Sequence, residues 1–351
     1  MSRMPHEGSV AVVGAGAMGM ALASHLQRNG AAVSLLATAR DGAVLEAWRE
    51  GAPHPGLDLP FPEVPLYPRD RWADVLPRAD VVFVAVTSAG LATVLADAAP
   101  GVGDAAVWTL ATKGWEPGTL RTPSEVAASV LEGAPIVSLG GPALAAELAV
   151  GSPTALLCAT RDRASGRRVA NLLTSRTTEA FTTPDFAGAE TAAAFKNVVA
   201  IAVGLAEGLA GRLVQRTPGN DFGNARAGVF AAGMRDMDRL VRSRGGRAAT
   251  VLGLGGAGDL FLTCLYGRNG RFGRLLGAGA SVESALSAIG STVEGVDNTA
   301  AALALAERSG IDLPSARIVE RALRQDASEE GAVERLREIF VEALSTRDRP
   351  S

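Results

Sequence analysis

The sequence predicts a two-domain protein in which an α/β domain with a mostly parallel sheet precedes an all-α domain. Its 351 residues are more than one ordinary hydrophobic core organises. Up to about residue 184, short apolar runs alternate with helical stretches, which is typical of a parallel, doubly wound sheet. Beyond that point, long Ala- and Leu-rich helical stretches follow one another. We therefore place the two domains at residues 1–184 and 185–351.

The α/β half begins with an apolar, β-branched run at 8–13, which predicts a buried parallel strand. A helix over 20–29 follows it and ends at Gly30. The proline-rich segment 51–68 interrupts the pattern and predicts an irregular excursion. The same reasoning predicts further strands at 32–37, 80–86, 105–110, 134–139 and 154–159.

The second half predicts helices at 187–210, 225–244, 298–309 and 315–325. One part of it, 192–209, is apolar enough to approach the length of a membrane span. That part carries two glycines and the charged residues Lys196 and Glu207. We therefore interpret it as the central core helix of a helical domain, with no stable membrane insertion.

The composition excludes several classes of function. The net charge of -3 and the pI of about 5.8 give no basic field for nucleic acid or anionic lipid. Two cysteines are too few for a disulfide framework, and three histidines within the first 54 residues argue against a histidine-based catalytic or metal site. The first nine residues lack the apolar core of a signal peptide, so we expect a cytoplasmic protein.

Only two of the 34 basic residues are lysine, Lys113 and Lys196. Arginine stays protonated near neutrality, whereas a buried lysine can release its proton. Lys196 lies in the apolar helix and predicts a proton donor and acceptor; the alternative is a packed stem with the head in water. Lys113 follows a strand at the sheet edge that faces the ligand crevice. In a Gly-rich stretch, Asp259 is either a helix N-cap or the partner of a buried cation, and beside Lys196 it would compensate that charge.

A glycine-rich loop, Gly14-Ala-Gly-Ala-Met-Gly19, follows the first strand and opens a helix. That context indicates the pyrophosphate loop of a Rossmann fold. The second strand ends without an acid, and Thr38 and Arg40 lie where the adenosine ribose should sit. Thr38 and Arg40 favour NADP as the cofactor. Asp41 leaves NAD as a possible cofactor; the alternative is that it only caps the next helix.

A second phosphate-binding pattern is the Gly-rich segment 266–273, which contains Arg268 and Asn269. A guanidinium gives a planar bidentate donor, and an amide group and free backbone N–H groups add further donors. The alternative interpretation is a solvated basic turn.

Taken together, these motifs resemble those of the bacterial-type NAD(P)-dependent glycerol-3-phosphate dehydrogenases over residues 9–325. The resemblance implies NAD(P)H-dependent reduction of dihydroxyacetone phosphate to sn-glycerol 3-phosphate, in glycerophospholipid metabolism and without a metal. It implies NADP or NAD as cofactor, with NADPH use favoured, a small phosphorylated substrate and no nucleic-acid partner, and it is compatible with a homodimer. The motifs are the Gly14 loop, Ala111–Gly114, Gly141-Pro142 with Glu147-Leu148, Phe195-Lys196-Asn197, Asn224-Ala-Arg226, Gly258–Leu260 with Leu262–Cys264, Arg268-Asn269 and Val293–Gly295.

The resemblance also implies the site residues, position by position. The catalytic residues it implies are Lys196, Lys113 and Asp259. The substrate-binding residues it implies are Lys113, Gly141, Ala143, Lys196, Asp259, Gly267, Arg268 and Asn269. The cofactor-binding residues it implies are Gly14, Gly16, Ala17, Met18, Gly19, Thr38, Arg40, Lys113, Ala145, Arg268 and Glu294.

The chain departs from the family pattern at several positions. Where the family has Ser-Gly-Pro-Thr, this chain has Gly140–Ala143, so two hydroxyls near the substrate are missing. Ala146, Met18 and Ala232 replace a lysine, an aromatic residue and an arginine, and 51–62 has no Tyr-Leu-Pro element. These departures keep open a dehydrogenase for another phosphorylated polyol or hydroxy acid. The other alternative is a dinucleotide-binding sensor without turnover, but a sensor needs no proton donor, and the set Lys113, Lys196, Asp259 and Arg268 is intact.

Overall fold

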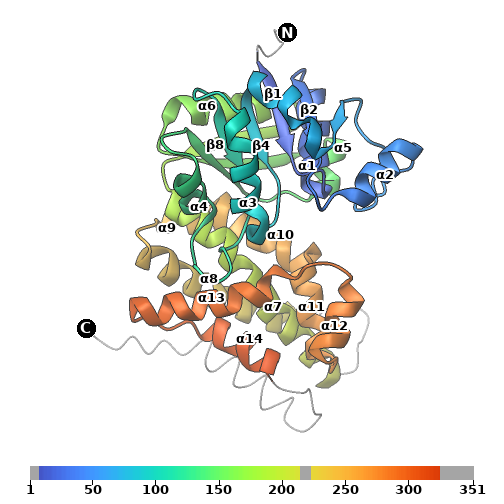
Figure 1. Ribbon diagram of the computed structural model, residues 1–351. Coiled ribbons are helices and arrows are strands. Elements are labelled where there is room, and N and C mark those ends of the chain that lie inside the picture. The colour runs from blue at the N-terminus through green and yellow to red at the C-terminus, as the bar shows by residue number, and fades with distance from the viewer. Residues whose placement is uncertain (1–7, 214–222, 325–351) are drawn as a thin grey trace. The chain divides into compact units, whose positions relative to one another are not determined.

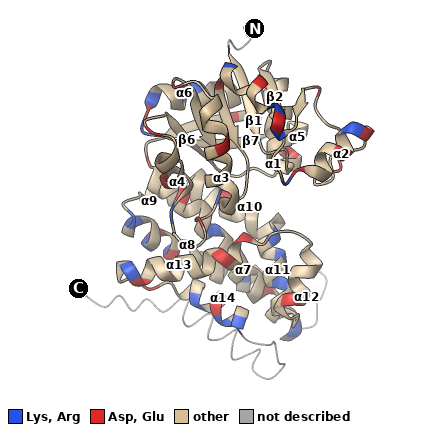
Figure 2. Cartoon of the chain, viewed as in Figure 1, with Lys and Arg blue, Asp and Glu red and all other residues tan. Residues whose placement is uncertain are grey.

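The computed structural model describes residues 8–213 and 223–324 of the chain (Figure 1). The chain divides into two compact units, Met1–Phe186 and Ala187–Ser351. The first contains a β-sheet covered by helices, and the second is helical. The predicted fold class, a Rossmann-like α/β domain with a parallel-rich sheet followed by an all-α domain, is confirmed. Lys and Arg are interspersed with Asp and Glu along both units (Figure 2).

The sheet of the first unit has eight strands in the order β3-β2-β1-β4-β5-β6-β7-β8. All neighbours pair in parallel except β6 and β7, which are antiparallel. The chain order reverses between β1 and β4, and ligands of open α/β sheets bind at the carboxyl ends of the strands at such a point. The strands are β1 (Ser9–Val13), β2 (Ala32–Leu36), β3 (Leu66–Tyr67), β4 (Ala79–Val84), β5 (Val107–Leu110), β6 (Ile136–Gly140), β7 (Thr154–Ala159) and β8 (Thr178–Thr183).

Helices cover both faces of this sheet, which explains why β1 is apolar from Val10 to Val13. Val10 and Val12 point into a core shared with α1, α5 and α6. Ala11 and Val13 point to the other face, into a core shared with α3 and α4. The helices are α1 (Ala17–Arg28), α2 (Gly42–Glu50), α3 (Ser88–Ala98), α4 (Pro123–Val130), α5 (Ala145–Val150), α6 (Arg163–Leu173) and the short 3₁₀ turns η1 (Arg69–Asp74), η2 (Leu76–Arg78) and η3 (Ala99–Gly101).

Two strands lie where the sequence predicts none. β3 is a two-residue strand inside the segment expected to be irregular, and it gains its pairing only from β2. β8 is an edge strand in which only Thr178 and Ala180 are buried, so it lacks the continuous apolar run by which buried strands are found. The first helix also begins earlier than predicted, at Ala17, so its first turn includes Gly19 of the glycine loop.

In the second unit, α7 is the long apolar helix predicted from the sequence. It is long and apolar enough to cross a membrane, and 89% of its most apolar window is buried in the protein. Extensive burial is also what a core helix requires. The helices of this unit are α7 (Phe186–Leu213), α8 (Gly223–Ser243), α9 (Ala248–Leu252), the π-helical turn η4 (Leu254–Gly258), α10 (Asp259–Tyr266), α11 (Arg268–Gly277), α12 (Val282–Ile289), α13 (Glu294–Ser309) and α14 (Pro314–Arg324).

A glycine seam lets α7 and α11 pack with their backbones in contact. A Cβ added to Gly204 would lie 2.1 Å from the carbonyl oxygen of Gly270, and one added to Gly208 would lie 2.3 Å from that of Arg274. A Cβ added to Gly273 would lie 2.1 Å from the carbonyl oxygen of Ile201. Because no side chain larger than hydrogen fits between them, these glycines fix the two helices at one separation.

Candidate functional site

The glycine loop after β1 has the shape that a bound pyrophosphate needs. Gly14 has φ +99°, and a Cβ there would lie 2.5 Å from the carbonyl oxygen of Ala85. A Cβ on Gly19 would lie 1.8 Å from the carbonyl oxygen of Gly14, so neither position accepts a side chain. A Cβ on Gly16, in contrast, would meet no atom of the described chain within 4 Å. Gly16 is also the N-cap of α1, so no capping side chain competes with an anion at this positive helix end.

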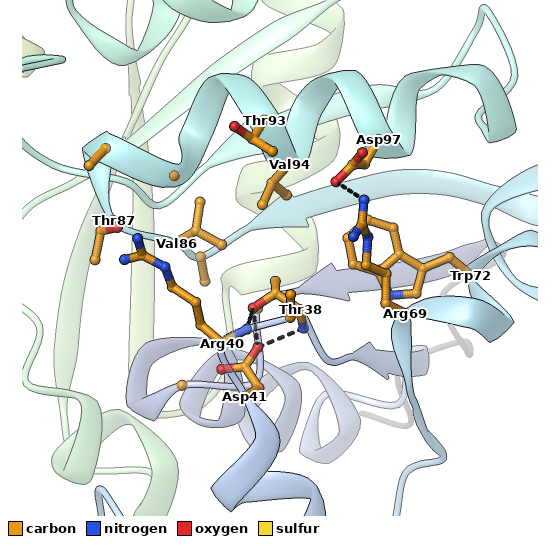
Figure 3. A pocket seen from close by; sticks show the side chains of 16 residues that line it. Thr38, Arg40, Asp41, Arg69, Trp72, Val86, Thr87, Thr93, Val94 and Asp97 are labelled. Carbon is orange, nitrogen blue, oxygen red and sulfur yellow. Dashed lines mark hydrogen bonds and ion pairs between the residues drawn. The ribbon is translucent and has the colours of Figure 1, made fainter.

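A pocket of about 330 Å³ opens beside this loop, at the carboxyl ends of β1, β2 and β4 (Figure 3). The side chain of Arg40 projects into it and points toward Thr87 (Figure 3). The pocket is lined by Gly14, Gly16, Thr38, Ala39, Arg40, Asp41, Arg69, Trp72, Ala85, Val86, Thr87, Ala89, Gly90, Thr93, Val94 and Asp97. Four of the residues predicted to bind the cofactor, Gly14, Gly16, Thr38 and Arg40, therefore line one cavity.

Asp41 braces the loop instead of capping α2. It occupies the N-cap position of α2 but makes no side-chain cap there. Its Oδ2 accepts hydrogen bonds from the backbone N–H groups of Ala15 at 3.1 Å and Thr38 at 2.7 Å, and from the Thr38 hydroxyl at 2.7 Å. The hydroxyl proton of Thr38 is thus already committed to Asp41, so of the two residues predicted at the ribose only Arg40 has a side-chain donor left to face the pocket.

His54, to which the sequence gives no role, supports the same loop. Its Nε2 lies 2.9 Å from the carbonyl oxygen of Ala15, and its Nδ1 accepts the backbone N–H of Gly56 at 3.0 Å. These partners select the tautomer with the proton on Nε2. The ring is buried and packs against Phe61 at 5.5 Å between centroids. The proline-rich excursion therefore buttresses the glycine loop.

Lys113 lies just beyond the carboxyl end of β5, as predicted. Its Nζ donates to the carbonyl oxygen of Gly141 at 3.3 Å. Gly141 directly follows β6, Ala143 lies in the turn after it, and Ala145 begins α5. The structure thus brings the predicted residues that follow β5 and β6 to the same edge of the sheet.

In the second unit, Lys196 and Asp259 form a buried ion pair. Nζ of Lys196 lies 2.5 Å from Oδ1 of Asp259, and the two side chains are 8% and 2% exposed. Lys196 comes from the middle of α7, and Asp259 begins α10 directly after the Gly-rich turn η4. Each buried charge is costly without its partner, so each residue compensates the charge of the other. The pairing inferred from the sequence is the one that the structure contains.

A buried amide network next to Lys196 joins three helices. Nδ2 of Asn269 donates to Oδ1 of Asn197 at 2.9 Å, and Nδ2 of Asn197 donates to Oε2 of Glu294 at 3.2 Å. Oδ1 of Asn269 accepts the backbone N–H of Gly295 at 2.9 Å. The side chain of Asn269 is therefore largely engaged within the protein, whereas Arg268 at the start of α11 is exposed. Asn197, which follows Lys196 directly in the sequence, was assigned no role of its own from the sequence.

The predicted residues thus fall into two sets, one in each unit. Those from Gly14 to Ala145 lie in the first unit, and those from Lys196 to Glu294 lie in the second. Gly267 is the N-cap of α11, the helix that begins with Arg268. Ala17 and Met18 are the first two residues of α1.

Comparisons with known proteins match both halves of the chain. Residues 9–165 match the family model of the NAD-dependent glycerol-3-phosphate dehydrogenase N-terminus, and residues 185–334 match that of the C-terminus. The glycerol-3-phosphate dehydrogenase (NAD(P)+) of Pseudoalteromonas translucida is 36% identical over 91% of this chain and 93% of its own length. That of Halorhodospira halophila is 36% identical over 94% of this chain and 96% of its own. A crystal structure of glycerol-3-phosphate dehydrogenase from Coxiella burnetii is similar with a TM-score of 0.82 and 32% identity, covering 95% of this chain and 98% of that one.

Proposed function

The chain belongs to the NAD-dependent glycerol-3-phosphate dehydrogenase family, and from this premise we propose how its own residues carry the family's reaction. It is an NAD(P)-dependent oxidoreductase that reduces dihydroxyacetone phosphate to sn-glycerol 3-phosphate. The expected family, activity and cofactor class are thereby confirmed. The two alternatives, a dehydrogenase for another phosphorylated polyol or hydroxy acid and a dinucleotide-binding sensor without turnover, are not favoured.

Residues 1–184 are proposed as the dinucleotide-binding domain, and residues 185–351 as the substrate and catalytic domain. The open space beside Gly16 and the uncapped amino end of α1 fit a pyrophosphate. When bound, the nicotinamide supplies the hydride. Arg40 is the proposed reader of a 2′-phosphate, which favours NADPH. Further cofactor contacts are assigned to Ala17, Met18, Gly19, Thr38, Lys113, Ala145, Arg268 and Glu294.

The buried Lys196–Asp259 pair carries this proposal. As the hydride reaches C2 of the substrate, the carbonyl oxygen gains negative charge, and Nζ of Lys196 donates a proton to it. The positive charge of the same ammonium stabilises that oxygen before the proton moves. Asp259 holds the ammonium in place at 2.5 Å and compensates its charge in the buried site. Solvent returns the proton to Lys196 for the next turnover.

The substrate phosphate is assigned to Arg268 and the amino end of α11. The exposed guanidinium offers bidentate donors, and the first-turn N–H groups add the positive end of the helix. Asn269 can contribute only its remaining N–H, so we assign it mainly to positioning: it ties α11 to Asn197, the neighbour of Lys196. Lys113, Gly141, Ala143 and Gly267 complete the proposed substrate contacts. Because this chain lacks the two hydroxyls that the family has here, we assign the substrate contacts at Gly141 and Ala143 to their backbone groups.

The test is steady-state oxidation of NADH and NADPH with dihydroxyacetone phosphate, against a panel of phosphorylated C3 to C6 ketoses. Lys196→Arg keeps the charge but cannot release a proton, so kcat should fall by roughly two to four decades. A near-normal kcat in the folded variant would remove Lys196 from the mechanism. A larger kcat/KM for another ketose phosphate would make that compound the assigned substrate in place of dihydroxyacetone phosphate. A cytoplasmic location and a homodimer remain part of the proposal.

A further inference from the structure

The cofactor pocket contains an ion pair that none of the roles above uses. Nη2 of Arg69 lies 2.6 Å from Oδ2 of Asp97, and both residues line the pocket. Arg69 begins η1 after β3, whereas Asp97 lies in the last turn of α3. The two side chains are 52% and 29% exposed, so a ligand in the pocket can reach both. The pair therefore faces the ligand space and is not buried in the core.

The pair lies away from the residues assigned to phosphate and ribose. Figure 3 shows Arg40 pointing toward Thr87 on one side of the pocket, with Arg69 and Asp97 on the other. Apolar side chains, Val94 among them, line the space between these groups. A dinucleotide with its pyrophosphate at the glycine loop and its ribose at the end of β2 would direct its base to this second side.

The free edges of the pair complement the edge of adenine. The contact between them uses one of the five N–H donors of Arg69 and one of about four acceptor positions of Asp97. Donors on Arg69 and acceptor positions on Asp97 thus remain for a ligand. Adenine presents the matching pattern, a 6-amino donor beside a ring-nitrogen acceptor. Hypoxanthine replaces that amino group by a carbonyl oxygen, which would oppose the carboxylate, acceptor against acceptor.

We propose that Arg69 and Asp97 read the base of the dinucleotide. Asp97 accepts a hydrogen bond from the 6-amino group, and Arg69 donates to the neighbouring ring nitrogen. The two residues thereby select a 6-aminopurine over a 6-oxopurine. This inference rests on the proposed function, because it requires that the pocket hold the adenosine half of the cofactor.

The experiment is a binding titration without substrate, followed by nicotinamide fluorescence. The ligands are NADH and reduced nicotinamide hypoxanthine dinucleotide. The parent should bind NADH at least about tenfold more tightly. Asp97→Ala should reduce this preference to about twofold or less, and Arg69→Ala should reduce it in the same direction. Asp74→Ala is the matched control: it breaks an exposed ion pair with Arg71 on η1, outside the pocket lining, and should keep the full preference.

The outcomes separate this inference from the function on which it rests. An unchanged preference in folded Asp97→Ala, or equal binding of both ligands by the parent, would overturn base reading and leave the dehydrogenase assignment intact. Loss of NADPH but not NADH binding in Arg69→Ala, with the base preference intact, would assign Arg69 to the 2′-phosphate and also overturn it. A parent that binds neither dinucleotide would remove the cofactor site itself, and this inference with it.

Discussion

Replacing Asp259 by Asn should expose how strongly the structure depends on the buried ion pair. The amide keeps the shape and one acceptor, but the ammonium of Lys196, only 8% exposed, loses its compensating charge. Removing one partner of a buried pair costs about 3–5 kcal/mol. The lysine can escape this cost by releasing its proton. For an ordinary lysine that escape costs about 4.6 kcal/mol at pH 7 and about 1.9 kcal/mol at pH 9. The destabilisation should therefore reach about 3–5 kcal/mol at pH 7 and fall below about 2 kcal/mol at pH 9.

The assay is urea unfolding of parent and variant at both pH values, alongside kcat. Glu320→Gln, which breaks an exposed pair with Arg324, is the control and should cost less than about 1 kcal/mol. Combining Lys196→Met with Asp259→Leu removes both charges and should recover most of the lost stability, but not the activity. A variant as stable as the parent at pH 7, or a loss that does not change with pH, would refute the reasoning.

Three further predictions follow from the structure. In Gly204→Ala the new Cβ would lie 2.1 Å from the carbonyl oxygen of Gly270, so α7 and α11 must separate. We expect the free energy of unfolding to fall by about 1–3 kcal/mol and kcat/KM to fall with it. The control is Gly42→Ala, which has no described atom within 4 Å and should be neutral or slightly stabilising in the same unfolding assay. Burial raises the pKa of Asp236 to about 6, above its value in the unfolded chain, so the folded protein favours the protonated carboxyl. The stability of the parent relative to Asp236→Asn should therefore fall by up to about 3 kcal/mol as pH rises from about 4 to 6. A stability difference that does not change with pH would contradict this. Arg40→Ala should raise KM for NADPH several-fold and leave NADH nearly untouched, and the NADPH preference should shrink at high salt; a strong NADH preference in the parent would defeat this assignment.

The sequence by itself determined the elements whose causes are local. The apolar run before Gly14 and the spacing of the loop glycines predict strand, turn and helix, because each depends on a few neighbouring residues. The scarcity of lysine singled out Lys196, and the apolar helix around it predicted its burial. The pairing with Asp259 could also be inferred, because a buried ammonium requires a counter-charge and the Gly-rich stretch around Asp259 carries no other acid.

Only the tertiary structure decided which polar groups meet across distant segments. From the sequence, Asp41 could read the ribose of NAD or cap α2, whereas in the structure its carboxylate binds the backbone N–H groups of Ala15 and Thr38. Asn269 has an amide suited to phosphate, but the packing of α11 against α7 and α13 commits it to the protein interior. The pairing of Arg69 with Asp97 likewise depends on β3, a two-residue strand that only its neighbour in the sheet defines. In each case the residue type permits several partners, and the partner is selected by distance and burial, which a linear pattern does not contain.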